Sequence, residues 1–335
     1  MIIVRIEIEI DINLAFFRQL LRSNREGPIM TSSTEAMKDT SLDKGHRVGN
    51  FHEYYKFNPP MNRLDVLQKC GILEYIKTTV IKHDTITQIA RERDSKRIKL
   101  DINEQHVKLD HTLAYCDLGC NEGDLSLALS KEMAEGLQTA CSLHCLGLDI
   151  DKELIDRARS KKNCQQDTGD ESNHPDKISS DVRVEAEFQV CNLNDEADHL
   201  TKCREYLDLA GKERFDLTSV FSTTMWIHIH SGDEGLVAFL KRVTSLTNHL
   251  LIEPQPSKCY GKVNVRLRKM NRPEEDISLE RLRMRNNIEV EIDKLLEEFG
   301  FERVVLDAKA STEGHENSRT KWKRNLQMYK RKNME

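Results

Sequence analysis

The fold of this chain is indicated most clearly by one stretch, Tyr115-Cys116-Asp117-Leu118-Gly119-Cys120-Asn121-Glu122-Gly123-Asp124-Leu125. The apolar run 113–118 ends here at two glycines, and apolar residues then recur at helical spacing at Leu125, Leu129 and Met133. The pattern predicts a strand that turns sharply into a helix. Open α/β sheets bind their ligands at such a turn, beyond the carboxyl end of a strand.

Strands and helices alternate along the rest of the chain. We predict further strands at 144–150, 182–190, 215–221 and 249–252, with helices around 154–158, at 196–209 and at 233–247. The C-terminal part adds a basic helix near 260–271, a long helix at 278–299, and strands at 301–307 and about 322–330. This alternation predicts an α/β fold with a mostly parallel seven-stranded sheet and helices on both faces.

The composition allows one large domain with polar segments outside its core. The chain has 335 residues, of which 38% are hydrophobic and 32% are charged. The polar segments near 84–111 and 161–181 have little to bury, so we predict insertions, the second being a mobile loop. Residues 1–45 are expected to form a peripheral, flexible extension, and residues 46–332 a single domain.

Several classes of protein are disfavoured. No run of eighteen apolar residues occurs, and acids interrupt the apolar residues of 2–10, so we expect neither a membrane span nor a secretory signal. The pairs Cys116/Cys120 and Cys141/Cys145 have a spacing that zinc could use. They lie in apolar runs, where cysteine packs as a small hydrophobe, so we expect no metal. A cytoplasmic monomer is expected, with the nucleus as the alternative location.

The residues of the first turn favour a sulfonium ligand over a dinucleotide. Asn121 stands where a dinucleotide fingerprint has glycine, and Asp117 would repel a pyrophosphate. Asp149 ends the next strand, where a carboxylate can accept hydrogen bonds from ribose hydroxyls. The combination resembles the class I (Rossmann-like) S-adenosylmethionine methyltransferases, and a dehydrogenase is the alternative.

Three further motifs narrow the resemblance. They are an aromatic arm at 49–63 with Tyr-Tyr-Lys-Phe-Asn-Pro-Pro, a Trp-Ile-His and Gly-Asp-Glu-Gly-Leu segment within 223–236, and Glu-Pro-Gln-Pro at 253–256. In this order, and over roughly residues 46–330, they resemble the bicoid-interacting-3 domain family of RNA methyltransferases.

The resemblance implies an activity on RNA 5′ ends. The arm and the Lys-Cys-Tyr that follows Glu-Pro-Gln-Pro are most similar to the branch that methylates the 5′-monophosphate of small RNAs, such as histidine tRNA or microRNA precursors. The capping branch, which methylates the γ-phosphate of a triphosphate small nuclear RNA, carries arginine where Asn58 stands here. That branch remains an alternative. So do an RNA-binding protein with weak turnover and a small-molecule methyltransferase.

The resemblance also implies roles for single residues in binding S-adenosylmethionine. Arg63 should bind the methionine carboxylate and Asp149 the ribose, while Asn192 and Leu193 flank the adenine. Tyr54 should close over the cofactor or the RNA end. The implied cofactor-binding residues are Arg63, Asp117, Gly119, Asn121, Asp149, Asn192, Leu193 and Phe221.

A basic run after Glu-Pro-Gln-Pro is expected to contact RNA phosphates. Residues 257–272 hold six Lys or Arg and no acid, and residues 319–332 hold seven more. A solvated helix face is the alternative interpretation of the first run. The predicted RNA-binding residues are Tyr54, Lys258, Tyr260, Lys262 and Arg266.

Structural alternatives exist for several of these residues. Arg63 could be a surface charge, Phe221 a core aromatic and Asp149 a helix cap. His228 and His230 invite a general-base role, but we expect them to belong to a packed helix start. A phosphate monoester oxygen is already anionic at neutral pH, so its methylation needs no base.

Overall fold

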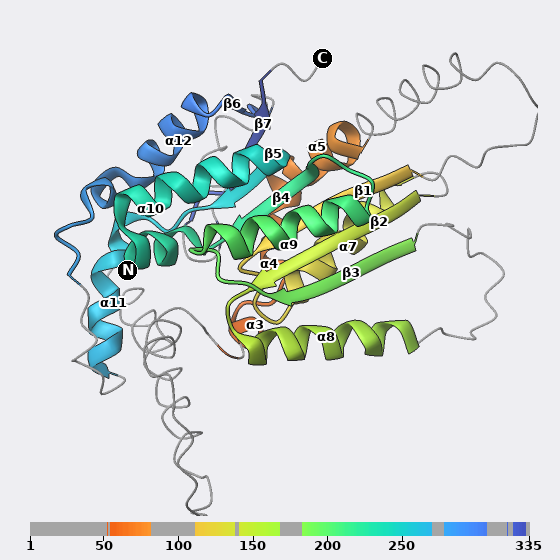
Figure 1. Cartoon of the computed structure of the whole chain (residues 1–335), viewed down its shortest axis with the longest axis horizontal. Coiled ribbons are helices and arrows are strands. Elements are labelled where there is room, and N and C mark those ends of the chain that lie inside the picture. The colour runs from red at the N-terminus through yellow and green to blue at the C-terminus, as the bar shows by residue number, and fades with distance from the viewer. Residues whose placement is uncertain are drawn as a thin grey trace, which may run out of the picture. The chain divides into compact units, whose positions relative to one another are not determined.

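The computed structural model describes residues 52, 54–81, 111–137, 141–167, 183–269, 278–306, 320 and 324–332. At the centre lies one seven-stranded sheet (Figure 1) with the order β3-β2-β1-β4-β5-β7-β6. Strands β1 to β5 run parallel, and β7 is antiparallel to both of its neighbours. The strands are β1 (His111–Leu118), β2 (Cys141–Asp149), β3 (Arg183–Val190), β4 (Phe215–Phe221), β5 (Thr247–Glu253), β6 (Phe301–Arg303) and β7 (Gln327–Arg331). The predicted sheet is confirmed.

Side chains of β1 alternate between two buried clusters, one on each face of the sheet. Ala114, Cys116 and Leu118 pack with α9 (Glu196–Leu209), α10 (Thr224–Leu246), α11 (Ser257–Lys269) and α12 (Ile288–Glu298). Leu113 and Tyr115 pack on the other face, with α4 (Met61–Lys69), α5 (Ile72–Tyr75), the π-helical turn Ile76–Val80, α7 (Asp124–Glu135) and α8 (Lys152–Asp167). Helices therefore cover both faces, as a buried parallel sheet requires. The short helix α3 (Tyr54–Phe57) precedes α4.

Two predicted helices differ in their extent. Helix α10 begins at Thr224, nine residues before the predicted 233–247, and bends at Gly232, whose φ is 72°. The predicted helix 278–299 is instead a 3₁₀ turn, η3 (Arg283–Asn287), followed by α12. The carboxylate of Asp233 accepts the backbone N–H groups of Arg283 and Met284, so it caps the start of η3, and the helical segment begins at Arg283 instead of at 278.

The predictions for the polar segments and the short strands also need correction. Helix α8 continues to Asp167, into the predicted loop 161–181, because Lys161 reaches Glu122 at 2.8 Å and Asp124 at 2.5 Å. The predicted strand 301–307 ends at Arg303, and the last strand is 327–331. Residues 1–51, 82–110 and 168–182 lie outside the described residues, so the extension and most of both insertions stay predictions.

Within the described ranges, no helix combines the length and apolar character needed to cross a membrane.

Phe239 on α10 offers a test of the core. Its side chain is fully buried, and its ring stacks on His199 at a centroid distance of 6.1 Å. Because truncation leaves a cavity, Phe239→Ala should lower the free energy of unfolding by about 3–5 kcal/mol in chemical denaturation. Leu209, which is 80% exposed, provides the control, and Leu209→Ala should change it by less than about 0.5 kcal/mol. A similar effect of the two substitutions would contradict this packing.

Candidate functional site

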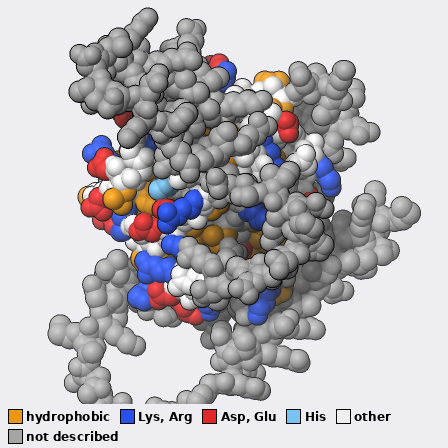
Figure 2. Space-filling model, turned by 90° about the vertical axis from the view of Figure 1, so that its right-hand side faces the viewer, with side chains coloured by type: hydrophobic (Ala, Val, Ile, Leu, Met, Phe, Trp, Pro, Cys, Tyr) orange, Lys and Arg blue, Asp and Glu red, His pale blue; other side chains and the backbone are white. Residues whose placement is uncertain are grey.

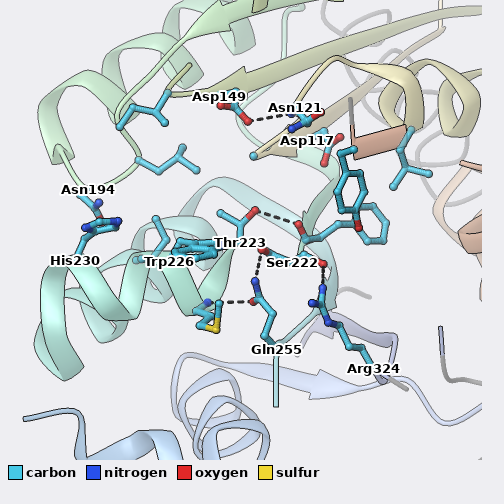
Figure 3. A pocket seen from close by; sticks show the side chains of 18 of the residues that line it. Asp117, Asn121, Asp149, Asn194, Ser222, Thr223, Trp226, His230, Gln255 and Arg324 are labelled. Carbon is cyan, nitrogen blue, oxygen red and sulfur yellow. Dashed lines mark hydrogen bonds between the residues drawn. The ribbon is translucent and has the colours of Figure 1, made fainter. Parts of the chain in front are cut away.

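A pocket opens beyond the carboxyl ends of β1, β2 and β4, at the place where the sequence predicted it (Figure 3). It brings together all eight predicted cofactor-binding residues and Tyr54. The residues come from the arm, the first turn and the carboxyl ends of the four strands β1 to β4. The predicted residues that line it are Tyr54, Arg63, Asp117, Gly119, Asn121, Asp149, Asn192, Leu193 and Phe221.

The first turn shapes one wall of the pocket. The backbone N–H groups of Gly119 and Cys120 both donate to the carbonyl of Leu148, at 2.7 and 3.0 Å, and tie the turn to β2. Gly119 has a φ of 81°, and a Cβ added there would lie 2.1 Å from the Oγ1 of Thr223. Only glycine allows this combination of left-handed backbone and close approach.

Asp117, at the end of β1, is held by two hydroxyl groups. Ser126 Oγ donates to its Oδ2 at 2.5 Å and Ser219 Oγ to its Oδ1 at 2.7 Å. Burial raises the pKa of this carboxyl, and the two hydroxyl groups act in the opposite direction. The carboxyl group is therefore fixed at the floor of the pocket.

Asp149, at the end of β2, accepts two backbone N–H groups. Asn121 donates to its Oδ2 at 2.9 Å and Asp151 to its Oδ1 at 3.0 Å. Burial raises the pKa of Asp149 to about 6 despite both bonds. Each carboxylate oxygen can accept more than one hydrogen bond, so the group can still bind a ligand with hydroxyl donors.

On the other side of the pocket, Arg63 of α4 and Glu253 of β5 form a buried ion pair. Arg63 Nη2 and Nε lie 2.7 and 3.2 Å from Glu253 Oε2, and the side chains are 2% and 0% exposed. Burial disfavours the charge of each partner, but the pair raises the pKa of Arg63 and lowers that of Glu253. Arg63 is therefore not a surface charge, which was the structural alternative.

Aromatic rings and hydroxyl groups complete the surroundings of Arg63. Its guanidinium lies 5.4 Å from the ring centroids of both Tyr54 and Phe221. Its Nη2 also donates to Tyr54 Oη at 2.7 Å and to Ser222 Oγ at 3.0 Å. Asn58, which is buried, donates to the same Tyr54 hydroxyl at 3.2 Å. The arm is thus connected to the strand ends by way of Arg63.

Among the polar residues of the pocket that sequence reasoning missed are Ser222, Gln255 and Arg324. Gln255 Oε1 accepts Met225 N at 3.1 Å, and its Nε2 donates to the carbonyl of Ser222. Arg324 donates to Ser222 Oγ and lowers the pKa of Glu253. The Glu-Pro-Gln-Pro motif was a signal for Gln255. Nothing in the spacing distinguishes Arg324 from the other cations of 319–332.

The predicted RNA-binding residues of α11 do not line the pocket. Lys258 and Lys262 are exposed, whereas Tyr260 is 1% exposed and its hydroxyl lies 2.9 Å from His228 Nδ1. Tyr260 therefore supports α10, and its predicted contact with RNA is corrected because the core encloses it. Arg266 belongs to α11, but its side chain lies outside the described residues.

The two histidines of α10 lie in different places. His228 is fully buried, with Nε2 2.7 Å from Asp233 Oδ1, and burial lowers its pKa. It does not line the pocket, in agreement with a packed helix start, whereas His230 does line it.

The described side chains of the pairs Cys116/Cys120 and Cys141/Cys145 are free thiols. Cys116, Cys120 and Cys145 are buried. Among the residues that the structure describes, no group of three or more His, Cys, Asp or Glu side chains could hold a metal ion.

Comparisons with known proteins find consistent similarities. Residues 215–331 match the family model of Bicoid-interacting protein 3. The chain is 30% identical over 284 residues to a pre-miRNA 5′-monophosphate methyltransferase of Xenopus laevis, covering 84% of this chain and 91% of the relative. It is 29% identical over 322 residues to an RNA 5′-monophosphate methyltransferase of Bos taurus, with coverages of 90% and 91%. The chain is 25% identical over 184 residues to a mouse 7SK snRNA methylphosphate capping enzyme. This match covers 44% of this chain and 27% of the relative.

A double-mutant cycle tests the ion pair. Arg63→Met should lower the free energy of unfolding by about 3–5 kcal/mol, because it leaves the Glu253 carboxylate buried without its partner. The double variant Arg63→Met/Glu253→Gln should lose less than the two single variants together. Urea denaturation of the four proteins measures the coupling. Strict additivity would show that the two side chains do not interact.

Proposed function

The chain belongs to the bicoid-interacting protein 3 family of methyltransferases, and we propose that it transfers a methyl group from S-adenosylmethionine to the 5′-monophosphate of a small RNA. The relatives that match over 84% and 90% of the chain carry this substrate in their names. The similarity to the capping enzyme covers 44% of the chain. These coverages favour the monophosphate over a triphosphate end.

The observation that carries the proposal is the separation of charge in the pocket. Asp117 and Asp149 lie on one side of the pocket and Arg324 lies on the other, where Arg63 and Arg324 both donate to Ser222 Oγ. Figure 3 shows the two aspartates opposite Ser222 and Arg324. S-Adenosylmethionine has a ribose and a sulfonium that suit the acidic side and a carboxylate that suits the cationic side. A phosphate monoester needs the cationic side as well.

The residues present fit S-adenosylmethionine. Asp149 would accept the ribose hydroxyls, and Asn192 and Leu193 would flank the adenine. Arg63 would bind the carboxylate through Nη1, which forms no hydrogen bond with the described residues. The close approach at Gly119 leaves the turn without a side chain that would fill this space. When bound, the cofactor supplies an electrophilic methyl group.

The protein need not remove a proton, because the attacking phosphate oxygen is anionic. Strong cationic binding of that oxygen would stabilise the ground state more than the transition state, in which charge is neutralised. We therefore assign the Lys and Arg side chains that contact the RNA to its non-attacking phosphate oxygens and its backbone. Tyr54 and Tyr55, both lining the pocket, would align the reactants and exclude water.

The buried position of Asn58 supports the preference for a monophosphate. Its Nδ2 donates to Tyr54 Oη, and its Oδ1 accepts Asn62 Nδ2 at 3.1 Å. A neutral amide engaged in this way supplies no positive charge to a longer phosphate chain.

The substrate can be tested with radiolabelled S-adenosylmethionine and one RNA sequence carrying a 5′-hydroxyl, a 5′-monophosphate or a 5′-triphosphate. We expect methyl transfer to the monophosphate, weaker transfer to the triphosphate and none to the hydroxyl, measured as label retained on the RNA. Preference for the triphosphate would favour the capping reaction, and RNA binding without transfer would leave only a binding protein.

The raised pKa of Asp149 predicts how cofactor binding depends on pH. Its pKa of about 6 means that the carboxyl group loses its charge below this pH and accepts ribose hydroxyls poorly. The affinity for S-adenosylhomocysteine, measured by isothermal titration, should therefore fall as the pH decreases from 7 to 5. Asp149→Asn should bind more weakly at pH 7 and lose this dependence. An unchanged pH profile in the variant would assign the titration to another group, such as His230.

A further inference from the structure

The segment that precedes α12 is attached to the wall of the pocket. Asp233 follows the bend in α10, and its Oδ2 and Oδ1 accept the N–H groups of Arg283 and Met284 at 3.1 and 3.3 Å. The same carboxylate is bound by His228 Nε2. Burial opposes the charge of Asp233, but these hydrogen bonds lower its pKa, so it is a stable anchor for η3.

Two further contacts bring this segment to the edge of the pocket and to α11. Arg281 Nη2 donates at 3.1 Å to the carbonyl of Ile229, the residue before the pocket-lining His230. Ser257 Oγ, at the start of α11, donates to the carbonyl of Arg285 at 2.5 Å. Residues distant in sequence therefore form one surface, with α11 and η3 side by side next to the pocket.

This surface is rich in positive charge. The described side chains of 257–265 and 278–287 include five cations and one carboxylate, Glu280. Arg283, 90% exposed, lies 3.6 Å from Asp233, while the other four cations form no ion pair with a described residue. On the side of the molecule opposite α11, Figure 2 shows Lys and Arg beside Asp and Glu. We name the five residues the cationic rim: Lys258, Lys262, Arg281, Arg283 and Arg285.

We propose that the cationic rim binds the backbone of the RNA beyond its 5′ nucleotide, with Arg281, Arg283 and Arg285 as contacts in addition to α11. The inference rests on the proposed function. The rim begins three residues after Gln255, which lines the pocket, so a strand whose 5′ phosphate occupies the pocket would cross it. Guanidinium groups suit phosphate oxygens, which they can bind with two parallel hydrogen bonds.

The rim can be tested in the full chain with Arg283→Gln/Arg285→Gln. The matched control is Lys131→Gln/Lys241→Gln, which removes equal charge from exposed positions on α7 and the C-terminal half of α10. Affinity for a 5′-phosphorylated RNA hairpin is measured by fluorescence polarisation over a series of salt concentrations. We expect a roughly tenfold loss for the rim variant at low salt, and a salt dependence shallower by about 1.4 to 1.8 in logarithmic slope, since two phosphate contacts are lost.

A second readout separates the backbone contact from a structural effect. The preference for the hairpin over a 5′-phosphorylated dinucleotide, as a ratio of KM values, should fall in the rim variant and stay unchanged in the control. Affinity for S-adenosylhomocysteine verifies folding. Hairpin affinity and salt slope equal to those of the control would overturn the proposal and leave the rim to another partner, such as an acidic protein. Absence of methyl transfer by the unmodified chain would refute the proposed function. The hairpin affinities would still show whether the cationic rim binds the RNA backbone.

Discussion

The ion pair between Arg63 and Glu253 is the contact on which the architecture of the pocket depends. The two residues are 190 positions apart, one on the arm and one at the end of β5. Two charges taken out of water are costly unless their geometry is good and further hydrogen bonds satisfy them. Tyr54 and Ser222 supply such bonds to Arg63, and Ser222 Oγ donates to Glu253 Oε2 at 2.5 Å. The ion pair that connects the arm to β5 therefore also neutralises the buried carboxylate of Glu253.

The strand ends meet this constraint with unusual local geometry. Ser222 has a φ of 56°, a left-handed conformation that costs energy for a residue other than glycine. Its carbonyl accepts a hydrogen bond from Gln255 Nε2, and its N–H donates to the carbonyl of Glu253 at 3.1 Å. The end of β5 and the residues that follow it therefore fix the loop after β4. Glu253 and Gln255 of the Glu-Pro-Gln-Pro motif thus have separate roles. One neutralises Arg63, and the other fixes Ser222 and the start of α10.

A pocket with acidic and cationic sides suits a reaction in which opposite charges disappear. In the proposed function, Asp117 and Asp149 would hold the cationic and hydroxyl-bearing parts of the cofactor, and Arg63 and Arg324, which also line the pocket, would bind anions. The net charge near the reacting atoms then stays small. The cationic rim lies outside the pocket, where positive charge can attract a polyanion without stabilising the attacking oxygen. This separation would let substrate affinity and reaction rate be adjusted independently.

The amino-acid sequence alone is enough to predict the sheet, the turn after β1 and most of the residues that line the pocket. Each of these depends on residues close in sequence: a strand and the loop that follows it are adjacent, and parallel strands place all their carboxyl ends at one edge.

Contacts between distant segments could not be inferred in this way. Nothing near Arg63 indicates that its partner is Glu253, and nothing near Arg324 sets it apart from neighbouring cations. The sequence predicts an RNA contact for Tyr260 in the basic run after Glu-Pro-Gln-Pro, but its place in the helix turns it into the core. The helix expected at 278–299 begins only at η3, where Asp233, fifty positions away in the sequence, accepts the first N–H groups. These features become visible only in the folded chain, because each depends on which buried donors and acceptors are brought together by folding.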